Sequence, residues 1–351
     1  MRSVSYTVNY VNNKYNEITI IFDTFAAQKN EIMIYSILLL IAGLALILFG
    51  ANYLVDGSSN IARRFGLSEF IIGLTIVGIG TSSPEMVISF LSAINGNADM
   101  AIGNVVGSNI FNTLLILGVT GIIAPVTITR SNLKKDIPLN IAVTILLILL
   151  GMSGSIFGIG GNVLSRIDGV ILLVIFAWYM WSSFRSNSQE DTAEEEQTSN
   201  HSMAISSLFI IGGLAGLVFG GKMFVNAATE IAKSFGVSDK FIAITVLAAG
   251  TSMPELATSV VAAAKGKGQL ALGNILGSNI SNILLILGGS ALICPLSFQG
   301  MSSIDLAAVL AGALLIMLSA YTFKKKSLDR VEGCIFVLME AAYMWYLIAN
   351  L

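Results

Sequence analysis

Two short segments of the sequence place a carboxylate inside a long apolar run. They read GTSSPE, from Gly80 to Glu85, and GTSMPE, from Gly250 to Glu255. Each proline lacks a backbone N–H, so a helix that runs through it loses a hydrogen bond and is interrupted. The neighbouring glycines make local unwinding easier. An interrupted helix with free carbonyl oxygens a turn before a carboxylate is the arrangement from which membrane cation sites are built.

The side chains around both glutamates offer oxygen at helical spacing. The threonine and serine of each motif stand four and three residues before the glutamate, so all three can approach one helical face. In the apolar run that follows each motif, an asparagine, a serine and a second asparagine recur every four residues, again on one face. The oxygen-bearing residues are Thr81, Ser82, Glu85, Asn104, Ser108 and Asn112 in the first copy and Thr251, Ser252, Glu255, Asn274, Ser278 and Asn282 in the second.

This set of residues favours a hard metal ion. It contains oxygen donors alone, without sulfur or imidazole, which suits Na⁺, Ca²⁺ or Mg²⁺ and disfavours zinc, copper and haem. The two glutamates give the cluster a charge of about −2 when both are ionised, which one Ca²⁺ or two Na⁺ would neutralise. A flexible cage of oxygens fits Ca²⁺ better than Mg²⁺, which retains its waters. Such a site is suited to exchanging Ca²⁺ for Na⁺.

Composition places these motifs in a membrane protein. The chain of 351 residues is 55% hydrophobic and only 11% charged, whereas a soluble domain has about 25% charged residues. Because the backbone in lipid must satisfy its own hydrogen bonds, apolar runs near membrane length indicate helices. We therefore expect an all-α polytopic membrane protein with ten transmembrane helices. Their approximate positions are 33–56, 67–95, 98–122, 136–156, 167–184, 204–229, 237–264, 268–293, 303–322 and 329–350.

The two halves of the chain repeat each other. At a constant offset of 170 residues, 27 of the 60 positions from Gly66 to Pro125 are identical in the segment from Gly236 to Pro295. Five helices per half is an odd number, so the second half must enter the membrane in the opposite sense. This predicts a 5+5 inverted-topology repeat with its site near the midplane, where the halves meet.

This organisation predicts four parts. They are a polar N-terminal tail at 1–32, a five-helix repeat at 33–184, an acidic linker at 185–203 and a second five-helix repeat at 204–351. The tail lacks the features of a signal peptide and is too polar to span a membrane. We hypothesise that native translation begins at Met33. The linker is expected to be a solvated loop, and a cation site in its glutamate run has no support.

Lysine and arginine are distributed unevenly between the loops. Twelve fall on one predicted face and four on the other, with three more in the N-terminal tail. Since cytoplasmic loops carry the excess of positive charge, both termini are expected outside and the linker inside. No basic arm suggests nucleic acid. Cys294 and Cys334 are expected to be small core residues rather than a disulfide or a metal pair.

At these motifs the chain resembles the calcium/cation antiporter superfamily, specifically prokaryotic sodium/calcium exchangers. The similarity covers the chain after about residue 33, and the segments that carry it are GTSSPE…GNVVGSNIFN and GTSMPE…GNILGSNISN. The resemblance implies ten helices in an inverted repeat and alternating access. It also implies a central ion cluster formed by the second, third, seventh and eighth helices.

The resemblance assigns ligands as well. The family's two glutamates bind Ca²⁺ and share in Na⁺ binding, and they match Glu85 and Glu255. Many members have aspartate where this chain has Asn282; potassium-dependent relatives look to rely on that acid, so its absence argues against K⁺ co-transport. The other implied ligands are Thr81, Ser82, Thr251, Ser252, Ser108, Asn112, Ser278 and Asn282 and the backbone carbonyls of Gly78 and Ala248.

The expected function is antiport of Na⁺ for Ca²⁺ in a prokaryotic plasma (inner) membrane. No cofactor and no obligate protein partner are expected beyond the two ions and lipid. One alternative is a Ca²⁺/H⁺ or other divalent cation antiporter, although the glutamate-containing second motif of proton-coupled relatives is absent. A second is a cation channel, whose acids usually come from symmetric subunits. A third is an intramembrane enzyme, but the one histidine, His201, lies in the linker. The glutamates could also be a purely structural pair.

Overall fold

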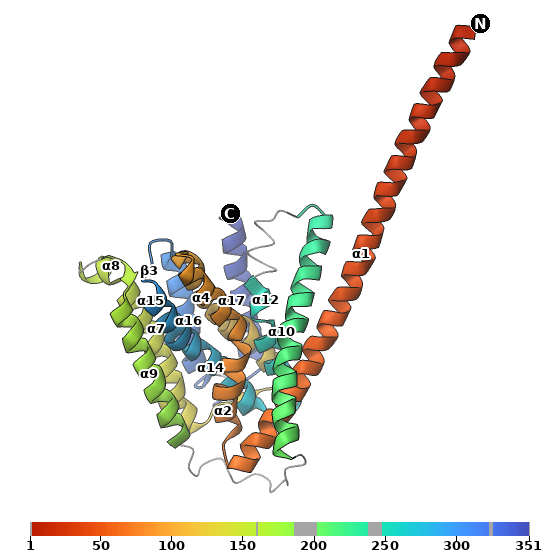
Figure 1. Cartoon of the computed structure of the whole chain (residues 1–351). Coiled ribbons are helices and arrows are strands. Elements are labelled where there is room, and N and C mark those ends of the chain that lie inside the picture. The colour runs from red at the N-terminus through yellow and green to blue at the C-terminus, as the bar shows by residue number, and fades with distance from the viewer. Residues whose placement is uncertain (1, 159–160, 186–201, 238–247, 323–325, 351) are drawn as a thin grey trace.

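The chain is helical nearly throughout. The computed structural model describes residues 2–158, 161–185, 202–237, 248–322 and 326–350. Within them, the strands form two short antiparallel pairs (Figure 1). Six helices are long and apolar enough to cross a membrane, and the bent pair Glu69–Thr81 and Ser83–Ile94 makes a seventh span. The predicted all-α architecture is confirmed.

The first half of the chain builds several of its crossings from consecutive helical pieces. π-Helical turns, whose hydrogen bonds run from i to i+5, lie inside three of them. The predicted segment 33–56 lies within α1, whose apolar span is Met33–Phe65 and whose helix continues upstream to Arg2. The elements are α1 (Arg2–Phe65), α2 (Glu69–Ile72), η1 (Gly73–Val77), α3 (Gly78–Thr81), α4 (Ser83–Ile94), α5 (Ala98–Phe111), η2 (Asn112–Ile116), α6 (Leu117–Ile123), β1 (Val126–Thr127), η3 (Asn132–Asp136), α7 (Ile137–Gly151), α8 (Ser153–Phe157), β2 (Val163–Leu164) and α9 (Arg166–Arg185).

The second half follows the same plan. Its predicted segment 237–264 is described from Ala248 onward, and nearly all of the predicted linker at 185–203 lies outside the described residues. The elements are α10 (Met203–Ser234), α12 (Ala248–Thr251), α13 (Met253–Ala264), α14 (Gly268–Ser281), η5 (Asn282–Leu287), α15 (Gly288–Ile293), β3 (Leu296–Ser297), α16 (Ser303–Ser319), β4 (Ser327–Leu328) and α17 (Arg330–Ala349).

The sequence repeat is also a repeat of local structure. In both halves the helix breaks at the serine of the first motif, and a π-helix begins at the last asparagine of the second motif. The strands β1 and β3 are offset by the same 170 residues. The duplicated residues therefore specify the same sequence of bends and turns twice.

The short sheets show that the two halves are inverted. β1 pairs with β4, whereas β3, its repeat equivalent, pairs with β2. Gln269, at the start of α14, donates a hydrogen bond to the carbonyl of Thr127, just after the end of α6. Because α14 begins at the face where α6 ends, the run α5–η2–α6 and its equivalent α14–η5–α15 cross the protein in opposite directions. The predicted inverted topology is confirmed.

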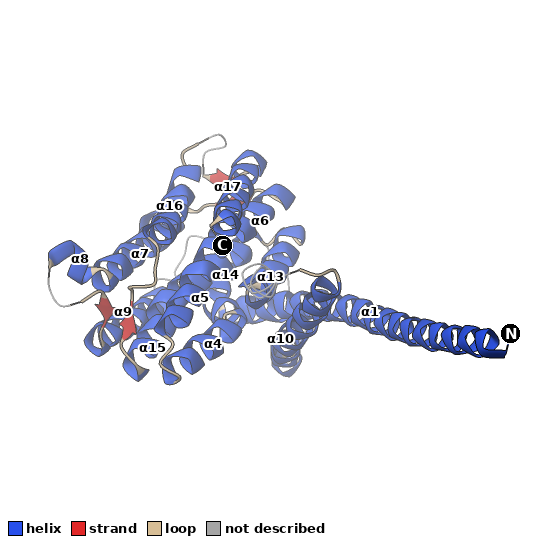
Figure 2. Cartoon of the chain, turned by 90° about the horizontal axis from the view of Figure 1, so that it is seen from above, coloured by secondary structure: helices blue, strands red, loops and turns tan. Residues whose placement is uncertain are grey.

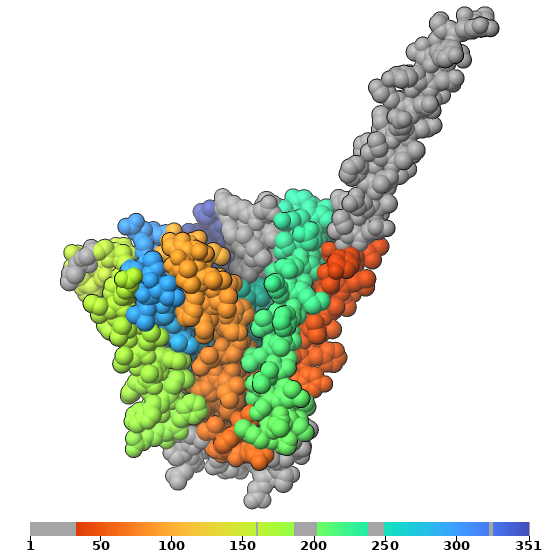
Figure 3. All heavy atoms as spheres, viewed as in Figure 1, coloured from red at the N-terminus to blue at the C-terminus, as the bar shows by residue number. Residues whose placement is uncertain are grey.

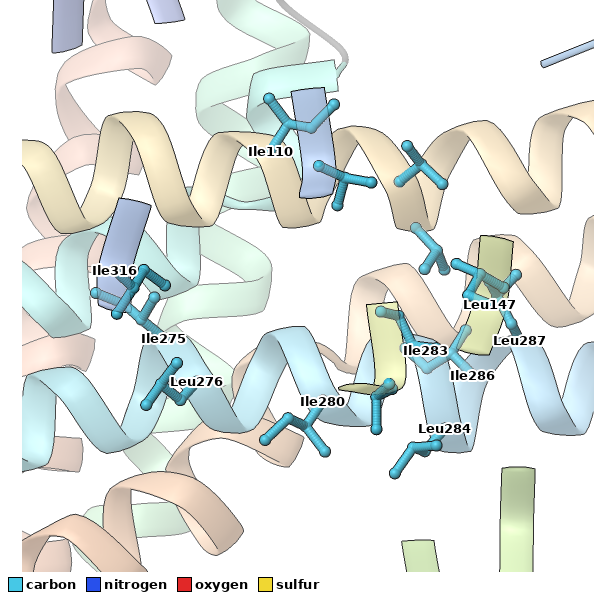
Figure 4. Packing of buried hydrophobic residues seen from close by; sticks show 14 of the residues in the cluster. Ile110, Leu147, Ile275, Leu276, Ile280, Ile283, Leu284, Ile286, Leu287 and Ile316 are labelled. Atoms are coloured by element: carbon cyan, nitrogen blue, oxygen red, sulfur yellow. The ribbon is translucent and has the colours of Figure 1, made fainter. Parts of the chain in front are cut away.

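The run α14–η5 forms the centre of the molecule. In its most apolar window 94% of the residues are buried within the protein, against 22% for α9. Figure 4 shows its leucine and isoleucine side chains in the same cluster as Ile110 of α5, Leu147 of α7 and Ile316 of α16. This run is therefore the core against which the site is built.

α1 and α10 lie side by side at one edge of the bundle (Figures 1 and 2). α10 also reaches the face of the molecule seen in Figure 3, as do α4 and α9. The close approach of α1 and α10 depends on glycine: a Cβ atom added to Gly43 would lie 2.7 Å from the backbone nitrogen of Phe224, and one added to Gly213 would lie 2.7 Å from that of Leu54. Small residues allow this contact, which drives helix association in lipid.

The glycines of the second motif differ between the halves. A Cβ atom on Gly273 or Gly277 would lie 2.2 Å or 2.3 Å from the carbonyl oxygens of Phe70 and Leu74, respectively. These two glycines therefore let α14 approach the backbone of α2 and η1 closely. Gly103 and Gly107, in the first half, have no described atom within 4 Å of such a position.

Adjacent glycines of α10 provide a test of the contact with α1. We expect Gly213→Ala to lower the free energy of unfolding by about 1–3 kcal/mol, because its methyl group overpacks against the α1 backbone. Gly212→Ala is the matched control, since a Cβ atom there meets nothing within 4 Å. Thermal unfolding of the purified protein in detergent, followed by size-exclusion chromatography, would measure both. Equal midpoints for the two variants would contradict the proposed packing.

Candidate functional site

Helix breaks bring both glutamates into the interior of the bundle. The chain bends by 48° between the pieces that flank Ser82. Pro84 and Pro254 occupy the first turns of the new helices α4 and α13, where a missing N–H does no harm. Glu85 and Glu255 follow in those same first turns. A helix N-terminus carries a partial positive charge, so it stabilises a carboxylate at this position.

The two glutamates are held by serines of the opposite repeat. Ser82 Oγ donates a hydrogen bond of 2.9 Å to Oε1 of Glu255, and Ser252 Oγ donates one of 3.1 Å to Oε1 of Glu85. Ser108 Oγ lies 3.4 Å from the same Glu85 oxygen. Each glutamate is only 1% exposed. Residues that are 167 to 173 positions apart in sequence therefore meet at one buried cluster.

The carbonyl of Gly78 also belongs to this cluster. It accepts a hydrogen bond from Ser278 Oγ at 3.2 Å and one from Thr81 Oγ1 at 3.3 Å. Thr81 Oγ1 lies 3.1 Å from Asn274 Oδ1 as well, so the first repeat contacts the eighth predicted crossing directly.

The equivalent positions of the second repeat are less enclosed. Thr251 is half-buried, whereas Thr81 is fully buried. The backbone of Ala248 begins the described part of its segment as the first residue of α12, and its side-chain surroundings lie outside the described residues.

One predicted free carbonyl is not free. The proline motif was expected to leave the carbonyl of Gly80 without a partner, but Ser83 Oγ donates a hydrogen bond of 2.7 Å to it. Serine hydroxyls commonly satisfy a nearby backbone carbonyl in this way. The carbonyl that faces the cluster is that of Gly78 instead.

Four buried oxygen atoms of the predicted ligands accept no hydrogen bond from any described residue. They are Oε2 of Glu85, Oε2 of Glu255, Oδ1 of Asn112 and Oδ1 of Asn282. Leaving such an acceptor unsatisfied costs about 1–3 kcal/mol, so folded proteins rarely retain several together. The four form two pairs related by the repeat. Buried oxygen acceptors without donors are available to a desolvated hard cation.

Asn104 and Asn274 were expected to face the cluster, and both use their amide nitrogens to bond the neighbouring glutamate-bearing helix, while Asn274 also contacts Thr81 of the cluster. The amide nitrogen of Asn104 donates to the backbone oxygen of Glu85 at 3.1 Å and to Ser89 Oγ at 3.0 Å. Asn274 makes the equivalent bonds to the backbone of Glu255 and to Ser259, at 3.3 Å and 2.9 Å. They tie each glutamate-bearing helix to the next crossing.

The sequence interpretation missed Asn109 and Asn279. Asn282 Nδ2 donates to Asn109 Oδ1 at 3.0 Å, and Asn112 Nδ2 donates to Asn279 Oδ1 at 3.2 Å. Both bonds cross between the repeats. A signal was available, since these asparagines belong to the GSN triplet that is identical in the two copies.

Elsewhere the described residues offer no competing metal centre. They contain no group of three or more His, Cys, Asp or Glu residues that could hold an ion. Cys294 and Cys334 are free thiols. Cys294 is half-buried, but Cys334 is exposed, so the prediction that both are core residues is wrong for Cys334.

Comparison with known proteins identifies the family. The model of the sodium/calcium exchanger protein family matches residues 35–185 and 205–349. The inner membrane protein YrbG of Escherichia coli (strain K12) is 36% identical over 274 residues, which are 75% of this chain and 81% of that protein. The sodium/calcium exchanger MaX1 of Methanosarcina acetivorans is 33% identical over 339 residues, which are 88% of this chain and 97% of that one.

A solved structure agrees with these relatives. The sodium-calcium exchanger NCX_Mj superposes on the chain with a TM-score of 0.76 at 34% identity, and the match covers 91% of this chain and 99% of that one. The matched length includes both halves of the duplication and both glutamate motifs. The chain therefore belongs to the sodium/calcium exchanger protein family and has its ten transmembrane helices in a 5+5 inverted repeat.

Proposed function

We propose that the protein is a secondary active antiporter that exchanges Na⁺ for Ca²⁺ across the membrane. The observation that carries the proposal is the pair of crossed glutamates, each with one buried oxygen that accepts no hydrogen bond from a described residue. A relative at 33% identity, MaX1, bears the name of a sodium/calcium exchanger, as does NCX_Mj. The transported ions are substrates, and no cofactor takes part.

The ligands we assign to the cation are the oxygens of this cluster. The two carboxylates supply its charge, and the neutral oxygens complete a cage of the kind that Ca²⁺ accepts. Their total of two negative charges is balanced either by one Ca²⁺ or by two Na⁺. The assigned ligands are Glu85, Glu255, Thr81, Ser82, Thr251, Ser252, Ser108, Asn112, Ser278 and Asn282, with the carbonyls of Gly78 and Ala248.

Burial of the site favours a transporter over a channel or an enzyme. The two glutamates are each 1% exposed, so an ion must reach them through a rearrangement rather than along an open pore. Rocking of one repeat against the other about a fixed site is the usual solution in inverted-repeat transporters. An imidazole base is not available at the site, because the one histidine of the sequence, His201, lies in the predicted linker.

Asymmetry between the repeats supports two alternating states. α1 packs along α13, and Lys265 Nζ at the end of this contact lies 2.7 Å from Asp56 Oδ1. The repeat-equivalent helices α10 and α4, both fully described, have no comparable contact. In an inverted repeat, the second state exchanges the roles of the two halves. Breaking the contact of α1 with α13 and forming the equivalent contact of α10 with α4 would then close the site to one face of the membrane and open it to the other.

We assign the Lys- and Arg-rich face to the cytoplasm, with both termini outside. Positive loop charge favours the cytoplasmic side. YrbG, at 36% identity, is named an inner membrane protein, which supports a plasma (inner) membrane location.

Neutralising either glutamate tests the site directly. We expect Glu85→Gln and Glu255→Gln each to reduce Ca²⁺ uptake into Na⁺-loaded inverted vesicles by more than about 100-fold, beyond the 10–100-fold typical of groups that only support a ligand. Glu340→Gln is the matched control, because Glu340 is a buried glutamate of α17 with no hydrogen bond to the site residues among those described. Normal exchange by Glu85→Gln would refute the assignment.

The driving ion separates Na⁺ from H⁺ coupling. Purified protein in liposomes should take up radioactive calcium when an outward Na⁺ gradient is imposed, and a pH gradient without Na⁺ should not replace it. If three Na⁺ exchange for one Ca²⁺, each cycle moves net charge, and valinomycin with K⁺ should accelerate uptake. Uptake driven equally well by protons alone would favour the Ca²⁺/H⁺ alternative.

Labelling of single cysteines tests the orientation. In a protein that carries Cys294→Ala and Cys334→Ala, we expect a membrane-impermeant maleimide added to intact cells to label Gln299→Cys but not Arg130→Cys. Both positions are exposed, and they lie at opposite faces: Gln299 is in a turn after β3, and Arg130 is in the first helical turn after β1. The reverse pattern would place the termini inside.

A further inference from the structure

Asn109 and Asn279 are buried between the two repeats, but they are not among the assigned ligands. Each is only 2% exposed. Each accepts the amide N–H of a ligand residue from the opposite repeat: Asn109 Oδ1 from Asn282 at 3.0 Å, and Asn279 Oδ1 from Asn112 at 3.2 Å. A side-chain amide at a cation site can present either its oxygen or its NH₂ group to the ion. These bonds determine which of the two faces the ion.

Hydrogen-bond chemistry determines the orientation of the Asn109 amide. Asn109 Nδ2 donates to the backbone carbonyl of Asn279 at 3.1 Å, and a carbonyl oxygen can only accept. Asn109 must therefore turn its Oδ1 toward Asn282. Asn282 must in turn present Nδ2 to Asn109, which leaves its own Oδ1 directed elsewhere. That oxygen is one of the four unpartnered acceptors of the cluster.

The other repeat reaches the same result with a different anchor. Asn279 Nδ2 donates to Thr113 Oγ1 at 2.9 Å, and Asn279 Oδ1 accepts from the amide nitrogen of Asn112 at 3.2 Å. A hydroxyl can donate or accept, so here the orientation follows from the two bonds taken together. The Oδ1 of Asn112 is again left without a partner. The repeat equivalent of Thr113 is Ile283, so a backbone carbonyl serves on one side and a hydroxyl on the other. The carbonyl of Asn279 and the hydroxyl of Thr113 are different groups, but in both repeats the ligand asparagine is left with an unpartnered Oδ1. This agreement argues against a coincidence of packing.

We propose that Asn109 and Asn279 are positioning residues that hold the amides of Asn282 and Asn112 with their oxygens toward the transported cation. The proposal rests on the proposed function, since it takes Asn112 and Asn282 as ligands. An amide that is free to rotate could present its NH₂ group, whose positive end repels a cation. The bonds to Asn109 and Asn279 remove that alternative before the ion arrives.

The same geometry constrains the chemical type of residue 282. Asn109 offers this residue an acceptor, so residue 282 must supply a donor. An ionised aspartate there would bring two acceptors face to face. The neutral Asn282 matches this demand and keeps the charge of the cluster at that of its two glutamates.

A double-mutant cycle on the full-length protein in detergent tests the proposal. Calcium affinity would be measured from the rise in the thermal unfolding midpoint as CaCl₂ is titrated. We expect Asn109→Leu to weaken Ca²⁺ binding by about 10–100-fold, the usual effect of losing a group that orients a metal ligand. Asn282→Leu should weaken it by at least as much. The double variant should be no more than about twofold weaker than Asn282→Leu alone, because Asn109 acts through Asn282.

A second pair and a control guard against misfolding. Thr113→Val is nearly isosteric, and it should weaken Ca²⁺ binding in the unaltered protein but not in Asn112→Leu. Thr120→Val is the control: Thr120 is fully buried on the same crossing, but its hydroxyl donates to its own helix at Ile116 and should leave Ca²⁺ affinity unchanged.

The outcomes separate this proposal from the proposed function. Additive losses in both cycles, or an Asn109→Leu variant with unchanged affinity, would overturn the positioning role. If the protein binds Ca²⁺ in this assay but shows no Na⁺-driven flux, the exchange function is overturned. The two double-mutant cycles would still decide the positioning role in that case. Absence of any Ca²⁺-induced shift in the unaltered protein would overturn the ligand assignment and the positioning proposal with it.

Discussion

The architecture depends on keeping two carboxylates in the interior of a membrane protein. A charged side chain at the centre of a bilayer costs about 2.5–3.5 kcal/mol on insertion scales. Each glutamate recovers part of this through a hydroxyl from the other repeat, Ser252 for Glu85 and Ser82 for Glu255. Because neither repeat can complete the surroundings of its own carboxylate, the two must pack with both motifs in contact. The duplication, its inversion and the buried position of α14 all serve that contact.

The six-residue motif solves two problems with one helix break. The piece that ends before the break points a carbonyl, that of Gly78, into the cluster, where Ser278 contacts it. The piece that begins after the break places Glu85 in its first turn, where the helix dipole favours negative charge. Proline is excluded from helix interiors but is well suited to a first turn, so Pro84 both enforces the break and starts the new helix. The Gly78 carbonyl accepts the bond from Ser278 in addition to its own helical bond from the Ser82 N–H.

Much of this could be predicted because the signals are local. Membrane-length apolar runs give the crossings, proline gives the helix breaks, and the 170-residue offset gives the repeat. The glutamates and the serines and threonines beside them were proposed as ligands from the same kind of local signal. The structure brings Ser82 and Ser252 onto the carboxylates across the repeat, a pairing that helical spacing within one segment cannot reveal.

The errors at the asparagines have a geometric cause. Spacings of four residues were taken as one helical face, but eight residues turn an α-helix about 80° past two full turns. Asn104 is therefore rotated away from Asn112 and bonds the backbone of Glu85 instead. Asn109 precedes Asn112 by three residues and lies about 60° from it, so it is the closer neighbour around the helix. The π-helix that begins at Asn112 changes the spacing further, and nothing in the apolar sequence NTLLI announces it.

Differences between the two repeats allow the protein to prefer one access state over the other. Two identical halves would make the states that exchange their roles equal in energy. Asp56 and Lys265 form an ion pair at the contact of α1 with α13, whereas their repeat equivalents are the neutral Asn226 and Asn95. Both partners are partly exposed, and such a pair is worth about 0–1 kcal/mol. That corresponds to a population ratio of roughly fivefold or less. In the proposed exchange the ion gradients alone set the direction of net transport, so a population bias of this kind changes the rate of exchange and not its direction.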